Sequence, residues 1–109
     1  MTCCEKRVTV KVLRVANVKM PEYGTENAAA MDFCSANVEN ITINPGEQAL
    51  IPLGIKVAVP VGYKLTLKPR SGLAFRRMIS VTNSPGTIDA DYRGEVKAIL
   101  INLGKNTFL

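Results

Sequence analysis

Apolar and polar residues alternate along this 109-residue chain in short runs, which is the period of β-strands. Val8, Val10 and Val12, for example, alternate with Thr9 and Lys11 near the start of the chain. Further runs with strand character, separated by turn residues, cover residues 41–43, 48–51, 54–60, 63–67, 78–81 and 94–101. Only residues 71–77 are expected to form a short helix. About seven short strands predict an all-β domain, either a barrel or a sandwich.

The chain shows no internal repeat and no interior linker, so residues 1–109 are predicted to form a single domain. Residues 104–106 are typical of a hairpin turn, and residues 107–109 are expected to begin a returning strand. A strand of three residues would leave its partner largely unpaired, which proteins usually avoid. We therefore expect the natural sequence to continue beyond Leu109, so that the domain is truncated at its C-terminus.

The net charge of +5 and the isoelectric point near 9.3 favour an anionic partner. Aromatic residues make up only 6% of the chain and tryptophan is absent, which disfavours a stacking surface for single-stranded nucleic acid. A phosphate-bearing small molecule fits the charge equally well. No apolar run reaches the roughly 18 residues of a membrane span, and the first residues lack a secretory signal. The sequence therefore predicts an intracellular protein without a membrane partner.

The cysteine and histidine content limits the chemistry. Cys3, Cys4 and Cys34 are an odd number without metal-ligand spacing, so we interpret them as free thiols. Histidine is absent, which excludes Ser/His and Cys/His nucleophiles. Any catalysis is expected to rest on carboxylates, a hydroxyl, arginines or a bound metal.

Two polar clusters precede residue 78. The segment AAAMDFCSA, residues 28–36, holds one carboxylate, Asp32, and taken alone it is better explained as an acid at a strand end. The segment KPRSGLAFRR, residues 68–77, combines four cations with a hydroxyl and a glycine. Arg70 offers a rigid fork for phosphate oxygens, Ser71 a hydroxyl donor, and Gly72 a permissive backbone. An anion cradle and a solvated basic loop are both consistent with this second segment.

The third cluster, NSPGTIDADYRG, covers residues 83–94 and opens with strong turn chemistry. In an extended segment, Asp89 and Asp91 would share a face and Tyr92 would lie on the other. A carboxylate near a phosphate-binding loop orients water or holds a metal. Taken alone, a solvated acidic hairpin explains this cluster better.

Together, the order of the three clusters changes the interpretation. AAAMDFCSA, PRSGLA and NSPGTIDADYRGEV resemble the motifs of the trimeric dUTPase family, the deoxyuridine triphosphate nucleotidohydrolases. The framing pieces PEYGTENAA and ALIPLGIKVAVPVGY are also similar, so the resemblance runs from about Val8 to the end. It implies a small jelly-roll-like β-barrel and a homotrimer with active sites between subunits. The implied reaction is hydrolysis of dUTP to dUMP and pyrophosphate with Mg²⁺.

The resemblance also assigns roles to matching residues. Asp89 corresponds to the carboxylate that activates water for attack on the α-phosphorus, and Asp32 to the acid that supports the metal through coordinated water. The implied substrate-binding residues are Arg70, Ser71 and Gly72 for the phosphates, Asn83, Gly86 and Ile88 for the uracil, and Tyr92 for the deoxyribose. Residues 83–92 are interpreted as a hairpin that forms the uracil pocket. Arg76 and Arg77 are interpreted as solvated or facing another subunit.

Some features depart from the family pattern. Ala30 and Met31 stand where the family usually carries a glycine and an aromatic residue. Two further motifs, one bearing a glutamine and one a glycine-rich closing arm, are absent from these 109 residues. Loss of the arm should reduce catalysis more than binding. The alternative function is therefore a catalytically weak, dUTPase-like nucleotide-binding or regulatory protein. A dCTP deaminase is disfavoured because that similar family carries an acidic residue just after the serine, whereas residues 71–75 hold no glutamate. A basic nucleic-acid binder is a more distant alternative.

Overall fold

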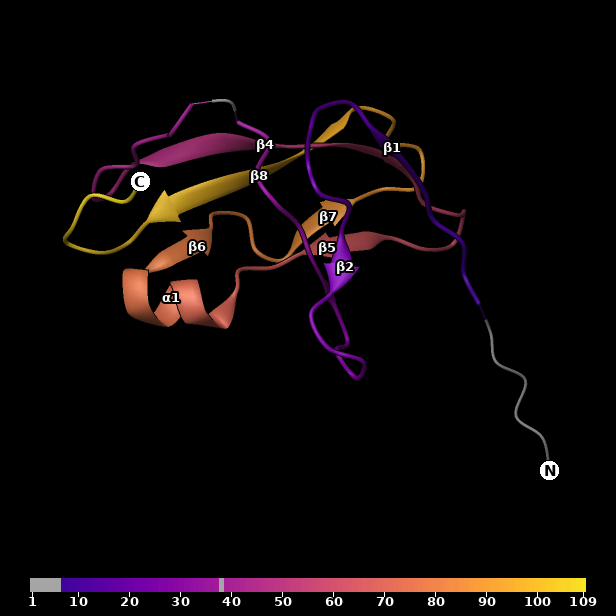
Figure 1. Cartoon of the computed structure of the whole chain (residues 1–109), viewed down its shortest axis with the longest axis horizontal. Helices are drawn as coiled ribbons and strands as arrows, with labels where there is room; N and C mark the ends of the chain where they lie inside the picture. The colour runs from indigo at the N-terminus through magenta and orange to yellow at the C-terminus, as the bar shows by residue number, and fades with distance from the viewer. Residues whose placement is uncertain (1–6, 38) are drawn as a thin grey trace.

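The structure is a computed structural model that describes residues 7–37 and 39–109 (Figure 1). Cys3 and Cys4 therefore lie outside the described residues, whereas Cys34 is a free, exposed thiol. No helix in the described part of the chain is long and apolar enough to cross a membrane. The elements are β1 (Lys11–Arg14), β2 (Glu22–Tyr23), β3 (Met31–Asp32), β4 (Gln48–Ala58), β5 (Leu65–Leu67), α1 (Ser71–Arg77), β6 (Ile79–Val81), β7 (Gly86–Ile88) and β8 (Glu95–Asn102).

The described strands form one antiparallel sheet and two small ribbons. The sheet has the order β1-β4-β8-β6, and the ribbons are β2-β3 and β5-β7. In Figure 1, β4 and β8 run side by side, with α1 below β6. The prediction of a mostly β fold with one short helix is confirmed, and the predicted helical segment coincides with α1.

The two strands predicted at residues 48–51 and 54–60 are one continuous strand, β4, with an irregular register. The irregularity lies at Gly54, whose φ of +71° is a conformation that glycine adopts at low cost. A Cβ atom on Gly54 would lie 2.7 Å from the Cβ of Ala36. The Gly54 N–H donates a hydrogen bond to the Glu95 side chain at 3.1 Å, so β8 supports the bend.

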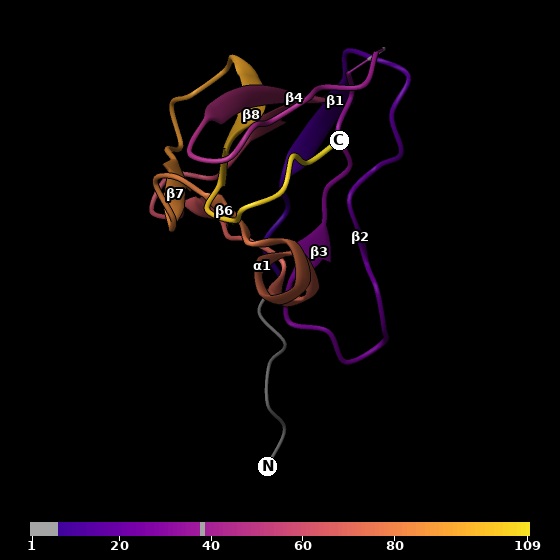
Figure 2. The same cartoon turned by 90° about the vertical axis from the view of Figure 1, so that its left-hand side faces the viewer.

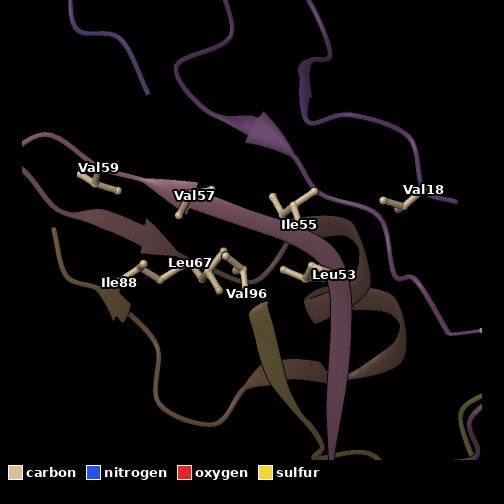
Figure 3. Packing of buried hydrophobic residues seen from close by; sticks show 8 residues of the cluster. All are labelled: Val18, Leu53, Ile55, Val57, Val59, Leu67, Ile88 and Val96. Atoms are coloured by element: carbon tan, nitrogen blue, oxygen red, sulfur yellow. The ribbon is translucent and has the colours of Figure 1, made fainter. Parts of the chain in front are cut away.

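The hydrophobic core lies between the sheet and the β5-β7 ribbon. Alternate side chains of β4 point to one face and are buried there, as the period of a strand requires. Figure 3 shows Leu67 of β5 and Val96 of β8 meeting under β4, with Ile88 of β7 beside them. Burial of such a side chain contributes about 1.5–3 kcal/mol. The core thus fixes the ribbon that leads into Asp89. The buried cluster consists of Val18, Leu53, Ile55, Val57, Val59, Leu67, Ile88 and Val96.

The last residues of the chain differ from the predicted hairpin. Phe108 does not return along β8 but forms an isolated antiparallel bridge with Ile43. The strand predicted at residues 41–43 is reduced to this one bridge. Pairing with Ile43 is favoured over a return along β8 because both the N–H and the carbonyl oxygen of Phe108 are then hydrogen-bonded, at 3.0 and 2.8 Å.

Asn102 at the end of β8 holds this region together. It is completely buried, and its amide nitrogen donates to the carbonyl oxygens of Ile43 and Asn106, both at 2.8 Å. Its side-chain oxygen accepts a hydrogen bond from the Gly104 N–H at 2.9 Å. A buried polar group is stable only when it is hydrogen-bonded in this way. Asn102 therefore fixes the loop that follows β8.

Candidate active site

The predicted phosphate-binding residues lie where the chain enters α1. Arg70 is the N-cap residue with extended backbone angles, φ −81° and ψ 135°, and its carbonyl oxygen accepts a hydrogen bond from the Ala74 N–H at 2.9 Å. Ser71 and Gly72 form the first turn. The Arg70 and Ser71 side chains are both exposed and therefore open to a ligand.

Asp32, at the end of β3, lies beside this loop. Arg70 Nε is 3.8 Å from Asp32 Oδ1, and Figure 2 shows β3 next to α1. The β2-β3 ribbon, with Glu22 opposite Asp32, presents the carboxylate there. Glu22 itself binds Lys19 at 2.7 Å, and this hydrogen bond, together with the Glu22 charge, raises the pKa of the Lys19 ammonium group. The structure thus brings together Asp32 and Arg70, which lie far apart in the sequence.

The predicted uracil-pocket segment, residues 83–92, is not a hairpin folded on itself. Its strand β7 pairs with β5, so that Ile88 lies opposite Leu65, because this pairing buries Ile88 in the core. The turn expected at its start is confirmed. A Cβ atom on Gly86 would lie 3.4 Å from the Asn83 side-chain nitrogen, so the Asn83 amide lies close against a bare stretch of backbone.

Asp89 begins a turn rather than continuing an extended strand. The Tyr92 N–H donates to the Asp89 carbonyl oxygen at 3.1 Å, so the expected extended arrangement of Asp89, Asp91 and Tyr92 is wrong. The Arg93 guanidinium donates to the carbonyl oxygens of Ala90 at 2.6 Å and of Tyr92 at 3.1 Å. Local hydrogen bonds therefore determine how this acidic segment turns.

The Tyr92 side chain has a fixed position. Its hydroxyl donates to the Glu95 carbonyl oxygen at 2.7 Å, and a Cβ atom on Gly94 would lie only 2.6 Å from the hydroxyl oxygen. Only glycine leaves room for the ring at that place. The role of Gly94 was missed at the sequence level, although its place two residues after Tyr92 in the motif was a signal.

Some of the predicted site residues line a common pocket of about 270 Å³. It is lined by the predicted site residues Ile88, Asp89 and Tyr92, and by none of Asp32, Arg70, Ser71 or Gly72. The other lining residues were missed, since Thr87 was overlooked beside Ile88 and the rest are brought to the pocket by strands β4 and β8, which pair with one another. They are Leu50, Thr87, Val96, Lys97 and Ile99.

The carboxylates suit a metal that is carried mainly by a ligand. Within residues 7–37 and 39–109, no group of three ligating His, Cys, Asp or Glu side chains is present. Mg²⁺ keeps several waters and commonly binds through one or two carboxylates plus substrate phosphates. The exposed Asp32, next to Arg70, fits such a shared site.

Comparisons with known proteins identify the family of the chain. The sequence profile of the dUTPase family matches residues 16–109. A deoxyuridine 5'-triphosphate nucleotidohydrolase of Rickettsia felis is 53% identical over 103 residues, covering 94% of this chain and 70% of the relative. The corresponding protein of Rickettsia bellii is 55% identical over 102 residues, covering 92% of this chain and 68% of the relative.

Solved structures show the same fold. The dUTPase from phage phi11 of S. aureus superposes with a TM-score of 0.79 at 30% identity, covering 88% of this chain and 60% of that chain. The Staphylococcus bacteriophage 80alpha dUTPase with dUPNHPP gives a TM-score of 0.77 at 29% identity, covering 89% of this chain and 56% of that chain. A mutant phi11 enzyme, similar to the same degree, coordinates a structural Mg(II) ion. The chain thus spans somewhat more than half the length of these solved relatives.

Proposed function

Because the chain belongs to the dUTPase family, we propose that it hydrolyses dUTP to dUMP and pyrophosphate. The observation that carries the proposal is the pocket shared by Ile88, Asp89 and Tyr92, which places a free carboxylate beside a buried apolar wall. A nucleoside has an apolar face and a phosphate end, so a pocket of this kind suits it. The proposal assigns the chain to the interior of the cell, where its substrate is made.

In this proposal, Asp89 is the catalytic residue. Its exposed carboxylate accepts a proton from the water molecule that attacks the α-phosphorus. The bond between the α-phosphorus and the bridging oxygen to the β-phosphorus then breaks, and pyrophosphate leaves. Because the Asp89 carbonyl oxygen is held by the Tyr92 N–H, the backbone that carries the carboxylate is fixed before the substrate binds.

Arg70, Ser71 and Gly72 bind the triphosphate. The guanidinium of Arg70 offers two parallel donors to phosphate oxygens, and the Ser71 hydroxyl donates near the bridging oxygen. Donors at that place stabilise the charge that develops on the leaving group. The bare backbone at Gly72 allows close approach of a phosphate, since a Cβ atom there would meet only the Arg76 side chain, at 3.5 Å.

Asn83, Gly86 and Ile88 recognise the uracil ring. The backbone of this segment pairs with the base edge and leaves no room for a 5-methyl or a 4-amino group, which rejects dTTP and dCTP. Tyr92 lies against the deoxyribose, where a 2'-hydroxyl would be crowded. The fixed position of the Tyr92 hydroxyl on the Glu95 carbonyl supports this role in rejecting UTP.

Mg²⁺ would bind the triphosphate oxygens, with Asp32 holding its coordinated waters. When bound, the ion supplies positive charge that orients the triphosphate and offsets its negative charge. Asp32 also contacts Arg70, so the same carboxylate holds the guanidinium next to the phosphates.

We also propose that the chain forms a homotrimer with sites between subunits. Among the described residues, the pocket around Asp89 is lined by none of Asp32, Arg70, Ser71 and Gly72, which supports completion of the site by a second chain. Leu50, which lines the Asp89 pocket, is 57% exposed, as an interface residue is before assembly. Sedimentation should give about 35 kDa, three times the 11.8 kDa of one chain. A mass of one chain at micromolar concentration would refute the trimer.

The reaction is tested by comparing Asp89→Asn with Asp91→Asn, its neighbour on the same turn. We expect Asp89→Asn to abolish pyrophosphate release from dUTP while dUTP still binds, and Asp91→Asn to retain release. Equal loss in both variants would reject Asp89 as the base. Binding of dUTP without release by the unsubstituted chain would favour the alternative of a nucleotide-binding protein.

A further inference from the structure

The helix that carries the phosphate-binding residues needs support from outside itself. α1 has seven residues and none is buried. Isolated helices of this length are not stable in water, so contacts with the rest of the chain must determine where α1 lies. Since Ser71 and Gly72 lie at its start, the position of α1 decides the position of the proposed phosphate loop.

The first support is a backbone contact at the end of α1. Met78 ends the helix in the left-handed conformation, with φ 54° and ψ 36°, and its N–H donates to the Ala74 carbonyl oxygen at 3.1 Å. The Met78 carbonyl oxygen then accepts a hydrogen bond from the Leu103 N–H at 2.8 Å. The loop that follows β8 is therefore attached to the end of the helix.

The second support is a side-chain contact. The guanidinium carbon of Arg77 lies 4.9 Å from the centroid of the Phe108 ring, within the range of a cation–π interaction. The Phe108 backbone is itself fixed by its bridge to Ile43. Arg77 thus connects the last turn of α1 to a segment 31 positions further along the chain.

The loop between Leu103 and Phe108 packs closely against the end of α1 and so allows both contacts. A Cβ atom on Gly104 would lie 3.3 Å from the Met78 Cβ and 3.4 Å from the Arg77 carbonyl oxygen, so a larger residue would crowd the helix end. The Gly104 N–H is held by the buried Asn102 side chain. The loop is therefore held to the sheet by Asn102 and packs closely against the end of α1.

We infer that residues 102–108 position the phosphate loop through α1, and that Arg77 and Phe108 are positioning residues for triphosphate binding. This inference rests on the proposed function. It adds to the interpretation of Arg77 as solvated or subunit-facing, because the exposed Arg77 guanidinium also has an aromatic partner within its own chain. If α1 moved away from these contacts, Arg70, Ser71 and Gly72 would no longer lie where they can bind the triphosphate.

The expected effect is set by the strength of the contact. A cation–π pair at an exposed site shifts an equilibrium about two- to fivefold. Loss of the contact lowers the fraction of molecules with a correctly placed α1, and the apparent affinity falls with that fraction. We therefore expect Arg77→Ala and Phe108→Leu each to weaken triphosphate binding measurably, by up to about fivefold. The double variant should be no weaker than either single variant, since both remove the same contact.

The test uses the 109-residue chain, with calorimetric binding of the non-hydrolysable dUTP analogue dUpNHpp and of deoxyuridine, which has no phosphate. Arg77→Lys keeps a cation for the ring and should restore binding. Arg14→Ala removes the same charge from exposed β1 and is the matched control. Amide hydrogen exchange of residues 71–77 without ligand reports the position of α1 independently, and it should be faster in Arg77→Ala and Phe108→Leu only.

The outcomes separate this inference from the proposed function. Weaker binding of dUpNHpp with unchanged binding of deoxyuridine, faster exchange in α1 and rescue by Arg77→Lys would support the positioning role. Unchanged binding or unchanged exchange in Arg77→Ala, relative to Arg14→Ala, would overturn it while dUTP recognition stood. Additive losses in the double variant would also overturn it. An unsubstituted chain that does not bind dUpNHpp would refute the proposed function and, with it, this inference.

Discussion

Arg70 Nε lies 3.8 Å from Asp32 Oδ1, so the N-cap residue of α1 and the end of β3 meet at one point on the surface. The Arg70 and Asp32 side chains are 70% and 47% exposed. Ion pairs this exposed contribute about 0–1 kcal/mol to folding stability. Stability alone is therefore a weak reason for the contact, and placement of a cation and a carboxylate for a shared ligand is a better one.

Asp32→Asn should separate these two roles. We expect the free energy of unfolding to change by less than about 1 kcal/mol, because the pair is exposed. The Mg²⁺ concentration for half-maximal dUTP hydrolysis should rise about tenfold, since an amide holds metal-bound water less well than a carboxylate does. Activity would be measured over a Mg²⁺ titration, with Glu22→Gln on the neighbouring strand as control. An unchanged Mg²⁺ dependence would exclude Asp32 from the metal site.

Gly94→Ala should displace Tyr92. The added Cβ atom would lie 2.6 Å from the Tyr92 hydroxyl oxygen, so the side chain must move and lose its hydrogen bond to the Glu95 carbonyl oxygen. We expect the ratio of kcat/KM for dUTP to that for UTP to fall about tenfold, because the ring no longer crowds a 2'-hydroxyl.

Tyr92→Phe is the matched control for this change. It removes the hydroxyl and its hydrogen bond, but Gly94 still leaves room for the ring, so it should retain most of the preference for dUTP over UTP. The same preference in Gly94→Ala as in the unsubstituted chain would show that Tyr92 does not select the sugar.

Asn102→Ala should destabilise the fold by about 2–4 kcal/mol. The substitution leaves three backbone groups, those of Ile43, Gly104 and Asn106, without their side-chain partner. Urea unfolding measures the loss. Asn106→Ala is the control, because Asn106 uses its backbone oxygen in this network and its side chain is exposed. A loss below about 1 kcal/mol in Asn102→Ala would mean that the network does not hold the loop.

Met78→Gly should stabilise the fold by about 0.5–1 kcal/mol. The left-handed conformation costs a residue with a side chain about 1–2 kcal/mol, and part of the gain is lost to the greater freedom of glycine in the unfolded chain. Thermal unfolding would show the gain. Met78→Ala keeps the Cβ atom and should give none, so that equal stability of the two variants would contradict this explanation.

Sequence patterns indicated candidate site residues, but not how the structure arranges them. Arg70, Ser71 and Gly72 could be proposed as a phosphate loop because they are contiguous, and the helix at Ser71–Arg77 was predicted correctly because this segment lacks strand alternation. Asp89 and Tyr92 could be proposed as site residues, but the turn between them was missed, because it depends on local hydrogen bonds that hydrophobic periodicity does not reveal.

Other features depend on contacts between distant segments, which the sequence does not display. Leu50 and Ile99 reach the Asp89 pocket through the β4–β8 register. In the sequence, Asn102 is an ordinary polar residue at a strand end. Its buried hydrogen bond to the Ile43 carbonyl oxygen depends on the segment that pairs with Phe108, which the sequence does not show. Strand alternation was sufficient to predict the mostly β fold, but not which strands pair.

Pyrophosphate release from dUTP is the most direct measurement of the central claim. It would be followed with Mg²⁺ present, and with UTP, dTTP and dCTP under the same conditions. The proposed uracil and deoxyribose contacts of Ile88 and Tyr92 predict release from dUTP and at least about a hundredfold less from each of the other three nucleotides. No release from dUTP, or equal release from all four nucleotides, would contradict the claim that this chain is a dUTP-specific hydrolase.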